Sequence, residues 1–487
     1  MATATYRFIV PGRYIGQTVT VFDQATNAQV ASGAVGSDGA YSVALAQGDY
    51  YATTPDGRYI DADSQGASDS DAASVIKAQQ SATYAGQPGL TMALLGDSQT
   101  NQNSFTSANN VQYNGNLWVY TSGQGFWTWA NAYLGQRFTQ VKASEANWEF
   151  GDSGLTAAQI LSGGHVDAVI AAKPAWCHYM AGTNDIFADG LDGPATFARN
   201  QTNVAKLIAA GIRVVVGTIL PRQTQNANQA TAVRVANKKM IDWAATQRNV
   251  VVNDWHMTLV DAATGNGKAV YFADGVHPFG AGASRMGYAL AKVLEPITPK
   301  SDRQIGLSGL LGLTQPLQAG TAGVFGGGNA AGGSGQLATG VTCYVNTGVT
   351  VVASKVARTD LIPGEWQQLQ MTSAATGAYN YTMRNSNAGV DWQAGDTVYA
   401  EVEYQTDAAA WNANQLSVTV RALPNDIRVD AAGNTSDTTL YQPVVSQGVM
   451  RTPNLVIPSG TAYVRVDVNC GGGTHTLRVG RMQLYKV

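Results

Sequence analysis

The sequence predicts a multidomain protein in which a central α/β domain with a parallel sheet lies between two β-rich regions. Its length of 487 residues is enough for more than one hydrophobic core. Within residues 90–297, apolar runs alternate with amphipathic stretches, which is the pattern of strands alternating with helices. The segments on either side instead alternate apolar and polar residues between turn residues, as β-strands do.

In the central domain, the succession of strand, helix and strand implies a parallel sheet with helices on both faces. Functional residues of such a sheet gather at the carboxyl ends of its strands. The expected strands are Thr91–Leu95, Asn147–Phe150, Trp176–Ala181, Ile212–Leu220 and Val250–Asn253. The expected helices are Gly125–Leu134, Leu155–Leu161, Ala195–Ala210, Ala227–Thr246 and Ala281–Leu294.

The flanking regions are expected to be β-sandwiches. Residues 1–60 read as a small β-sandwich, and residues 61–89, rich in Asp, Ser, Ala and Gly, as a linker. Residues 298–340 are glycine-rich, which fits either a linker or the tightly turned start of the next domain. Residues 341–487 are expected to form a jelly-roll β-sandwich. Its tryptophans, Trp366, Trp392 and Trp411, suit either a sugar-binding surface or the sandwich core.

Composition argues against several partners. Charged residues make up 13% of the chain, about half the usual ~25%, and the net charge is -3. We therefore expect no nucleic acid and no anionic membrane as a partner. No stretch is apolar enough to span a membrane, and the first residues lack the pattern of a secretory signal. The three cysteines are expected to be free buried thiols, although Cys343 and Cys470 would meet if the first and last strands of one domain were neighbours.

A serine follows the first expected strand of the central domain. The apolar run ends at Leu95, and the chain then turns through Gly96, Asp97 and Ser98. A glycine permits a sharp turn, and a serine just beyond a parallel strand projects its hydroxyl over the edge of the sheet, as a nucleophile requires. These residues are also common in ordinary turns, so the tripeptide alone favours an ordinary turn.

An aspartate and a histidine lie close together in the stretch DGVH. Two residues separate Asp274 from His277, so both side chains can face the same way in a turn. The carboxylate can then accept a hydrogen bond from Nδ1 of the imidazole, which leaves Nε2 free to take a proton from Ser98. Taken alone, this pair is more typical of a solvated loop.

Two further turns offer hydrogen-bond donors. In GDSGLT, the backbone N–H of Gly154 can point into a site, and Asp152 or Ser153 is a candidate N-cap of the following helix; the two roles are compatible. In AGTNDIF, the amide of Asn184 supplies two uncharged donors, which suit a developing oxyanion. An ordinary turn is the alternative for this stretch as well.

Together the four stretches resemble the SGNH hydrolases, also called the GDSL esterase family. The blocks of this family, named for Ser, Gly, Asn and His, occur here in order as GDS (Ser98), SGLT (Gly154), GTND (Asn184) and DGVH (His277). They span about 200 residues and all lie where one sheet edge would gather them. Two departures are that block one reads GDSQ, without the Leu of the family name, and that block two lacks its usual preceding Asn.

The resemblance implies a three-layer, flavodoxin-like α/β domain and a serine esterase that needs no cofactor and no metal. It implies that Ser98 is the nucleophile, that His277 is the general base and acid, and that Asp274 orients the histidine. It further implies an oxyanion hole formed by the backbone N–H groups of Ser98 and Gly154 with the side chain of Asn184.

Other residues near these blocks have supporting or binding roles as candidates. Asp97 is expected to steady the Ser98 loop and Asp185 to hold its own turn. Trp118 and Trp148 are candidates for substrate binding, because aromatic faces stack on sugar rings, with core packing as the alternative.

A hydrolase between two β-domains, with a glycine-rich surface of low charge, resembles a bacteriophage tail fibre or tailspike. This resemblance implies removal of acyl groups, chiefly acetyl, from an acylated surface polysaccharide by a trimeric protein of the virion tail. The N-terminal domain would attach to a tail-protein partner, and the C-terminal domain would bind carbohydrate or promote oligomerisation. The alternatives are a secreted bacterial carbohydrate esterase with a binding module and a glycan-binding adhesin without activity. The intact Ser98, Asp274 and His277 argue against the adhesin.

Overall fold

The protein is described by a computed structural model in which the chain forms two compact units, Met1–Pro88 and Gly89–Val487. Each unit is described by itself. The structure describes residues 3–9, 15–23, 28–37, 40–46, 50–53, 55, 59–61, 90–103, 118–120, 125–144, 149–261, 263–272, 274–278, 281–298, 310–311, 317–360, 364–373, 378–406, 415–431 and 447–487. The linker is expected at residues 61–89; Asp61 is the last residue of a strand, and residues 62–89 lie outside the described residues.

The N-terminal unit is β-rich. Its described strands form an antiparallel pair and a sheet in the order β3-β2-β5-β6. Alternate positions point inward, so Val19 and Val21 of β2 meet Phe8, Val35 and Ala52 in a small apolar core. The strands are β1 (Thr3–Ile9), β2 (Thr18–Asp23), β3 (Gln29–Ala34), β4 (Ala40–Ala46), β5 (Tyr50–Thr53) and β6 (Tyr59–Asp61).

The central domain contains the predicted parallel sheet. Its described strands follow the order β12-β11-β10-β7-β9, and every neighbouring pair is parallel. This order places β7 and β10, which precede the first and third motifs, side by side. The strands are β7 (Leu90–Gly96), β9 (Phe138–Gln140), β10 (Trp176–Met180), β11 (Arg213–Gly217) and β12 (Val250–Asn253).

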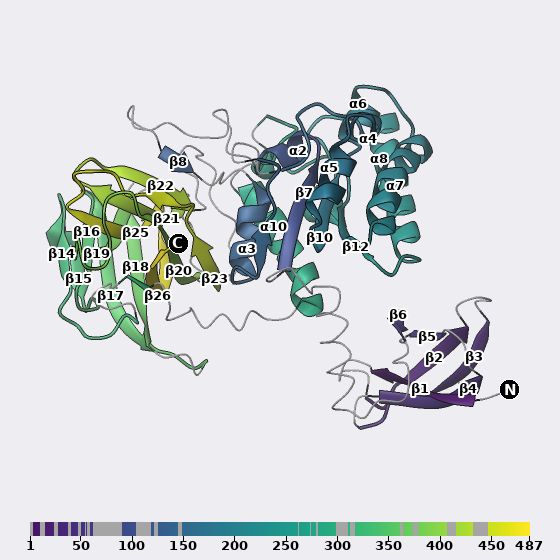
Figure 1. The fold of residues 1–487 in the computed structure, drawn as a ribbon, viewed down its shortest axis with the longest axis horizontal. Helices are drawn as coiled ribbons and strands as arrows, with labels where there is room; N and C mark the ends of the chain where they lie inside the picture. The colour runs from purple at the N-terminus through teal and green to yellow at the C-terminus, as the bar shows by residue number, and fades with distance from the viewer. Residues whose placement is uncertain are drawn as a thin grey trace. The chain divides into compact units, whose positions relative to one another are not determined.

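Helices cover both faces of this sheet, as Figure 1 shows. The alternation of side chains along β7 makes the two faces, with Met92 and Leu94 in one apolar cluster and Ala93 and Leu95 in the other. The first cluster includes side chains of α3 (Phe126–Tyr133), α9 (Trp255–Leu259) and α10 (Ala281–Leu294). The second includes side chains of α4 (Ala157–Ser162), α5 (His165–Ala172), α7 (Gly193–Ala209) and α8 (Ala227–Ala244).

One expected strand is wrong. Glu149 and Phe150 form a bend, the rest of the expected strand Asn147–Phe150 lies outside the described residues, and the strand beside β7 is β9. The end of this stretch is instead bonded to β7, because the backbone N–H of Phe150 donates to Leu94 O at 2.8 Å. The next residue, Gly151, lies so close to Gly96 that a side chain there would collide with the Gly96 carbonyl. The second motif is therefore held against the end of β7 without being a strand.

The C-terminal region is β-rich, as predicted, and its described strands form two sheets around one apolar core. One sheet follows the order β15-β17-β18-β26-β20-β23, with β13 on β26 and β24 on β20. The other follows the order β14-β16-β19-β25-β21-β22-β8. The strands are β8 (Trp118–Tyr120), β13 (Leu310–Leu311), β14 (Val324–Gly326), β15 (Gly333–Gly335), β16 (Thr342–Val345), β17 (Val349–Ala357), β18 (Glu365–Ser373), β19 (Ala378–Asn385), β20 (Thr397–Thr406), β21 (Gln415–Leu423), β22 (Ile427–Ala431), β23 (Gln447–Arg451), β24 (Leu455–Val456), β25 (Tyr463–Gly471) and β26 (His475–Lys486).

These sheets take up strands from before residue 341, where the sequence predicted the sandwich to begin. Strand β14 pairs with β16 and β15 pairs with β17, so the glycine-rich stretch contributes strands to both sheets. Trp366 and Trp392 are 8% and 3% exposed and therefore belong to the interior, whereas Trp411 lies outside the described residues.

The central domain and the C-terminal sheets share packing within the second unit. Trp129, Ala132 and Ala283 belong to the same apolar cluster as the sheet core, and Gln136 Nε2 donates to Val449 O at 2.7 Å. The three cysteines are unpaired and buried. In the part of the chain that the structure describes, no helix combines the length and the apolar character needed to cross a membrane.

Candidate active site

The carboxyl end of β7 presents Ser98 at the edge of the sheet. The strand ends at Gly96, where a side chain would collide with the carbonyl of Met180 on the neighbouring β10. Asp97 then caps the short helix α2 (Ser98–Asn101), because its Oδ1 accepts from the Gln99 N–H at 3.0 Å. Ser98 is thus the first residue of a helix that begins directly above the sheet, and it remains partly exposed.

The structure brings Ser98, His277 and Asp274 into one hydrogen-bonded chain. Ser98 Oγ lies 2.9 Å from Nε2 of His277, and Nδ1 of that ring lies 2.7 Å from Asp274 Oδ2. With the proton of the neutral ring on Nδ1, Nε2 accepts from the serine hydroxyl. This is the arrangement in which an imidazole can take the proton of an attacking hydroxyl.

The carboxylate of Asp274 is held by the backbone of its own loop. Asp274 Oδ1 accepts from the backbone N–H groups of Val276 and His277 at 2.9 and 2.7 Å. Burial acts to raise the pKa of Asp274, but the hydrogen bonds from His277 and from the two backbone groups outweigh it and lower the pKa. Gln99 Nε2 also donates to Val276 O at 2.9 Å, which ties the loop to the helix that bears Ser98.

Two predicted oxyanion donors lie on neighbouring loops. Gly154 has a φ of 83°, in the left-handed region that favours glycine, and a Cβ there would meet no atom within 4 Å. The N-cap of the following helix α4 is Thr156, and not Asp152 or Ser153, because Thr156 and Gln159 form a capping box. Asn184, in helix α6 (Thr183–Phe187), donates through Nδ2 to Leu155 O at 2.9 Å. This bond uses one of the two amide hydrogens and leaves the second for a ligand.

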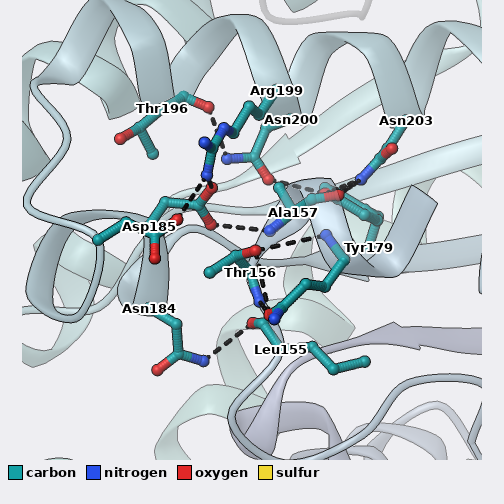
Figure 2. Close-up of polar contacts among 12 residues, drawn as sticks. Leu155, Thr156, Ala157, Tyr179, Asn184, Asp185, Thr196, Arg199, Asn200 and Asn203 are labelled. Atoms are coloured by element: carbon teal, nitrogen blue, oxygen red, sulfur yellow. Dashed lines mark hydrogen bonds and ion pairs between the residues drawn. The ribbon is translucent and has the colours of Figure 1, made fainter. Parts of the chain in front are cut away.

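A buried carboxylate next to Asn184 bonds the first residue of α4 (Figure 2). Asp185 is fully buried, and its Oδ2 accepts from the N–H of Ala157, the first residue of α4, at 2.8 Å. Its Oδ1 accepts from Arg199 Nη1 on α7 at 2.9 Å, and the same nitrogen donates to Asp189 at 2.8 Å. Asp185 therefore does more than hold its own turn, because it connects α4, α6 and α7.

A second buried network lies beside the first in Figure 2. The Tyr179 hydroxyl on β10 donates to Asn200 Oδ1 at 2.8 Å and accepts from Asn203 Nδ2 at 2.9 Å. Asn203 Nδ2 also donates to Ala157 O at 2.8 Å. Helix α4 is thus bonded at both the N–H and the carbonyl of Ala157, which restrains the loop that carries Gly154.

Asp97 lies next to the serine but is almost entirely buried, at 1% exposure. Burial is the largest cause that raises the pKa of Asp97, and the nearby charge of Asp185 acts in the same direction, while the Gln99 N–H and Arg222 act to lower it. The net result is a pKa of about 7. The side chain thus caps the helix under Ser98, in keeping with its predicted role, and its charge changes near neutral pH.

Arg222 is a residue of this edge that the sequence analysis missed. It follows β11, and its Nε and Nη2 lie 3.4 and 3.2 Å from Thr183 Oγ1, directly before Asn184. Its guanidinium lies 3.8 Å from the ring centre of Phe187. The signal that would have found it is its position beyond the carboxyl end of a parallel strand, which the predicted site residues share.

The two candidate sugar-binding tryptophans remain predictions. Trp148 lies outside the described residues, and Trp118 belongs to β8 with its side chain outside them as well. Among the described side chains, no group of three or more His, Cys, Asp or Glu is placed to hold a metal ion.

Comparison with a family model supports the class of the central domain. Residues 94–285 match the model of the GDSL-like Lipase/Acylhydrolase family, and this segment contains Ser98, Gly154, Asn184, Asp274 and His277. The match covers less than half of the chain. It supports a GDSL-type acylhydrolase, and hence a hydrolase, in the central domain.

Solved structures similar to the chain cover the same part of it. A carbohydrate esterase family 3 protein from Talaromyces cellulolyticus is 19% identical, with 43% of this chain and 97% of that chain covered and a TM-score of 0.32. A GDSL-like lipase from Bacteroides thetaiotaomicron is 18% identical, with 46% and 98% covered and a TM-score of 0.31. A lipolytic G-D-S-L family protein from Veillonella parvula is 21% identical, with 42% and 98% covered and a TM-score of 0.32. No curated protein matches the chain.

Proposed function

We propose that this protein is a serine esterase that removes acyl groups, specifically O-acetyl groups, from a bacterial surface polysaccharide. The observation that carries the proposal is the continuous chain from Ser98 Oγ through His277 to Asp274, with separations of 2.9 and 2.7 Å. It lies in the domain that matches the GDSL-like acylhydrolase model. A hydroxyl activated in this way, next to amide donors, suits acyl transfer.

In the proposed mechanism, Ser98 Oγ attacks the ester carbonyl while His277 Nε2 takes the hydroxyl proton. The backbone N–H groups of Ser98 and Gly154 and the free hydrogen of Asn184 Nδ2 stabilise the oxyanion. The imidazolium then donates its proton to the departing sugar oxygen, which leaves the acyl group on Ser98. A water, activated by the same histidine, hydrolyses this acyl-enzyme and releases the acid.

We further propose that the protein works as a trimeric component of a phage tail. The support is the order of its parts, a β-rich N-terminal unit, a hydrolase and a β-rich C-terminal region. In this proposal the N-terminal unit attaches to another tail protein, and the C-terminal region binds glycan or promotes oligomerisation. The mass of the purified protein in solution tests the trimer, and a stable monomer would contradict it.

Acetate release tests the proposed activity. Wild type and Ser98→Ala are compared on acetylated polysaccharides and on a small aryl acetate. The control is Ser162→Ala, which changes an exposed serine at the end of α4. We expect release by wild type and by the control, and a loss of at least about 10³-fold in Ser98→Ala. Folded wild type that releases acetate from no substrate would instead favour a glycan-binding adhesin without activity.

A further inference from the structure

We infer that Arg222 binds a carboxylate on the sugar that carries the ester, so that the substrate is an acylated acidic polysaccharide. The inference rests on the proposed esterase function and adds the charge of the substrate to it. It follows from where Arg222 lies, from what holds its guanidinium, and from what that guanidinium lacks.

Arg222 lies among three of the four catalytic motifs. Its side chain bonds Thr183, which directly precedes Asn184 of the third motif. Its carboxylate neighbours are Asp97 of the first motif and Asp274 of the fourth, both close enough for their charges to interact with it. The adjacent residue, Gln223, donates its backbone N–H to Gly275 O at 3.0 Å, which fixes this loop to the one that carries Asp274 and His277.

The guanidinium is held on one side and lacks a partner on the other. Nε and Nη2 both face Thr183 Oγ1, and the plane lies 3.8 Å from the centre of the Phe187 ring. Among the residues that the structure describes, Arg222 forms no ion pair with a carboxylate, and Nη1 has no hydrogen-bond partner. The other site carboxylates are committed, because Asp274 bonds His277 and Asp97 caps α2.

A carboxylate is the ligand that best fits this arrangement. The planar guanidinium presents N–H groups in a fixed fork that matches the two oxygens of a carboxylate. Because Arg222 is half-buried, such a pair would be less screened than one on the open surface. The negative charge of Asp274 would repel an acidic substrate from the catalytic edge, and Arg222 supplies the compensating attraction.

The surroundings of Phe187 leave room for more of a polymer. The ring of Phe187 packs against the Arg222 guanidinium. Phe187 also lines a cavity of about 470 Å³ between the segment that follows α6 and the first turns of α8. Its lining includes the apolar Ile186, Leu191 and Val235 and the polar Asn228. Cavities of this size are in the range of small-molecule sites. A sugar next to the esterified one would occupy it when the carboxylate is on Arg222.

Two substrates that differ only at the carboxyl group, one a free acid and the other its methyl ester, test the inference. They are the methyl glycoside of an O-acetylated glucuronic acid and the 6-methyl ester of the same compound, with acetate release as the readout. We expect wild type to prefer the free acid in kcat/KM, and Arg222→Gln to reduce this preference by about 10- to 100-fold through KM. Lys238→Gln, which removes a charge on the exposed face of α8, is the control and should keep the wild-type preference.

Several results would overturn the inference. One is a wild type that hydrolyses both esters equally, and another is an Arg222→Gln variant that loses the same factor on both, as a residue that only positions the loops would. Arg222→Lys keeps the charge and should retain part of the preference, which guards against a poorly folded Gln variant. Stronger inhibition of wild type by glycerol phosphate than by glucuronate would assign the site to phosphate instead. A wild type that releases no acetate from any ester would contradict the proposed function itself.

Discussion

Two carboxylates of the candidate active site are held in opposite ways. Asp274 is 49% exposed at its side chain and bonds residues two and three positions along its own loop. Asp185 is fully buried and bonds Ala157 and Arg199, which are 28 and 14 positions away. The first is part of a local loop, whereas the second depends on the assembled fold.

This difference teaches where each residue should act. An exposed, locally bonded carboxylate contributes little to global stability, so changing Asp274 should affect the chemistry alone. A buried carboxylate that loses its charge weakens its bonds to an arginine and a backbone N–H. Changing Asp185 should therefore affect stability first and the reaction second, through the position of Asn184.

The largest expected effect is on catalysis and comes from changing Asp274. In Asp274→Asn, the amide no longer favours the Nδ1 proton of His277, so the ring loses the tautomer that accepts from Ser98. We expect kcat on an aryl acetate to fall by about 10²- to 10⁴-fold with the thermal midpoint nearly unchanged. Asp242→Asn, at an exposed helical pair with Lys238, is the matched control. If kcat falls by less than about tenfold, Asp274 is not the residue that orients His277.

The next effect separates Asp185 from its exposed neighbour. Asp185 and Asp189 both bond Arg199 Nη1, at 2.9 and 2.8 Å, but their side chains are 0% and 42% exposed. We expect Asp185→Asn to lower the free energy of unfolding by about 3 kcal/mol and Asp189→Asn by less than about 1 kcal/mol. Chemical denaturation measures both.

Activity distinguishes a role in the site from a purely structural one. If the buried bonds of Asp185 position Asn184, kcat should fall about tenfold in Asp185→Asn under conditions where the variant remains folded. KM for a small ester should change less, because the substrate contacts themselves are kept. If Asp185→Asn and Asp189→Asn lower the free energy of unfolding equally, the bond of Arg199 to the buried Asp185 contributes no more than its bond to the exposed Asp189.

The sequence was sufficient to predict the features that repeat along the chain. The period of apolar residues located β10, β11 and β12, and the position of motifs after strands placed Ser98 at the sheet edge with Asp274 and His277. It failed at Asn147–Phe150, because a short apolar stretch that packs on β7 by one backbone bond looks like a strand.

The sequence did not reveal the partners of the motifs. Arg199 reaches Asp185 from the middle of a helix, and Arg222 reaches Thr183 from a loop 39 positions away. Arg199 carries no local pattern, and the signal for Arg222 is limited to its position after β11, since an arginine in a helix or a loop is ordinarily a solvated surface residue. Only the assembled fold shows which arginines turn toward the site.

The last expected effect concerns Asp97 and depends on pH. In the unfolded chain this carboxyl releases its proton near its ordinary pKa of 3.8, whereas in the folded protein burial raises the pKa to about 7. Below pH 4 both the folded and the unfolded protein hold this proton, so Asp97 does not lower the free energy of unfolding there. Between these values the folded state must keep a proton that the unfolded chain has lost. The free energy of unfolding therefore falls as the pH rises through this window, by at most about 4 kcal/mol.

Asp97→Asn removes this titration but keeps a side chain that can cap α2. The thermal midpoint of the variant relative to wild type should therefore rise between pH 4 and pH 7 and change little outside that range. Asp192→Asn, at the exposed cap of α7, is the matched substitution of a cap on the surface. A midpoint difference for Asp97→Asn that is the same at pH 4 and pH 7 would mean that Asp97 stays ionised across this range. Its charge would then be compensated within the fold, with Arg222 as the nearest cation that acts on it.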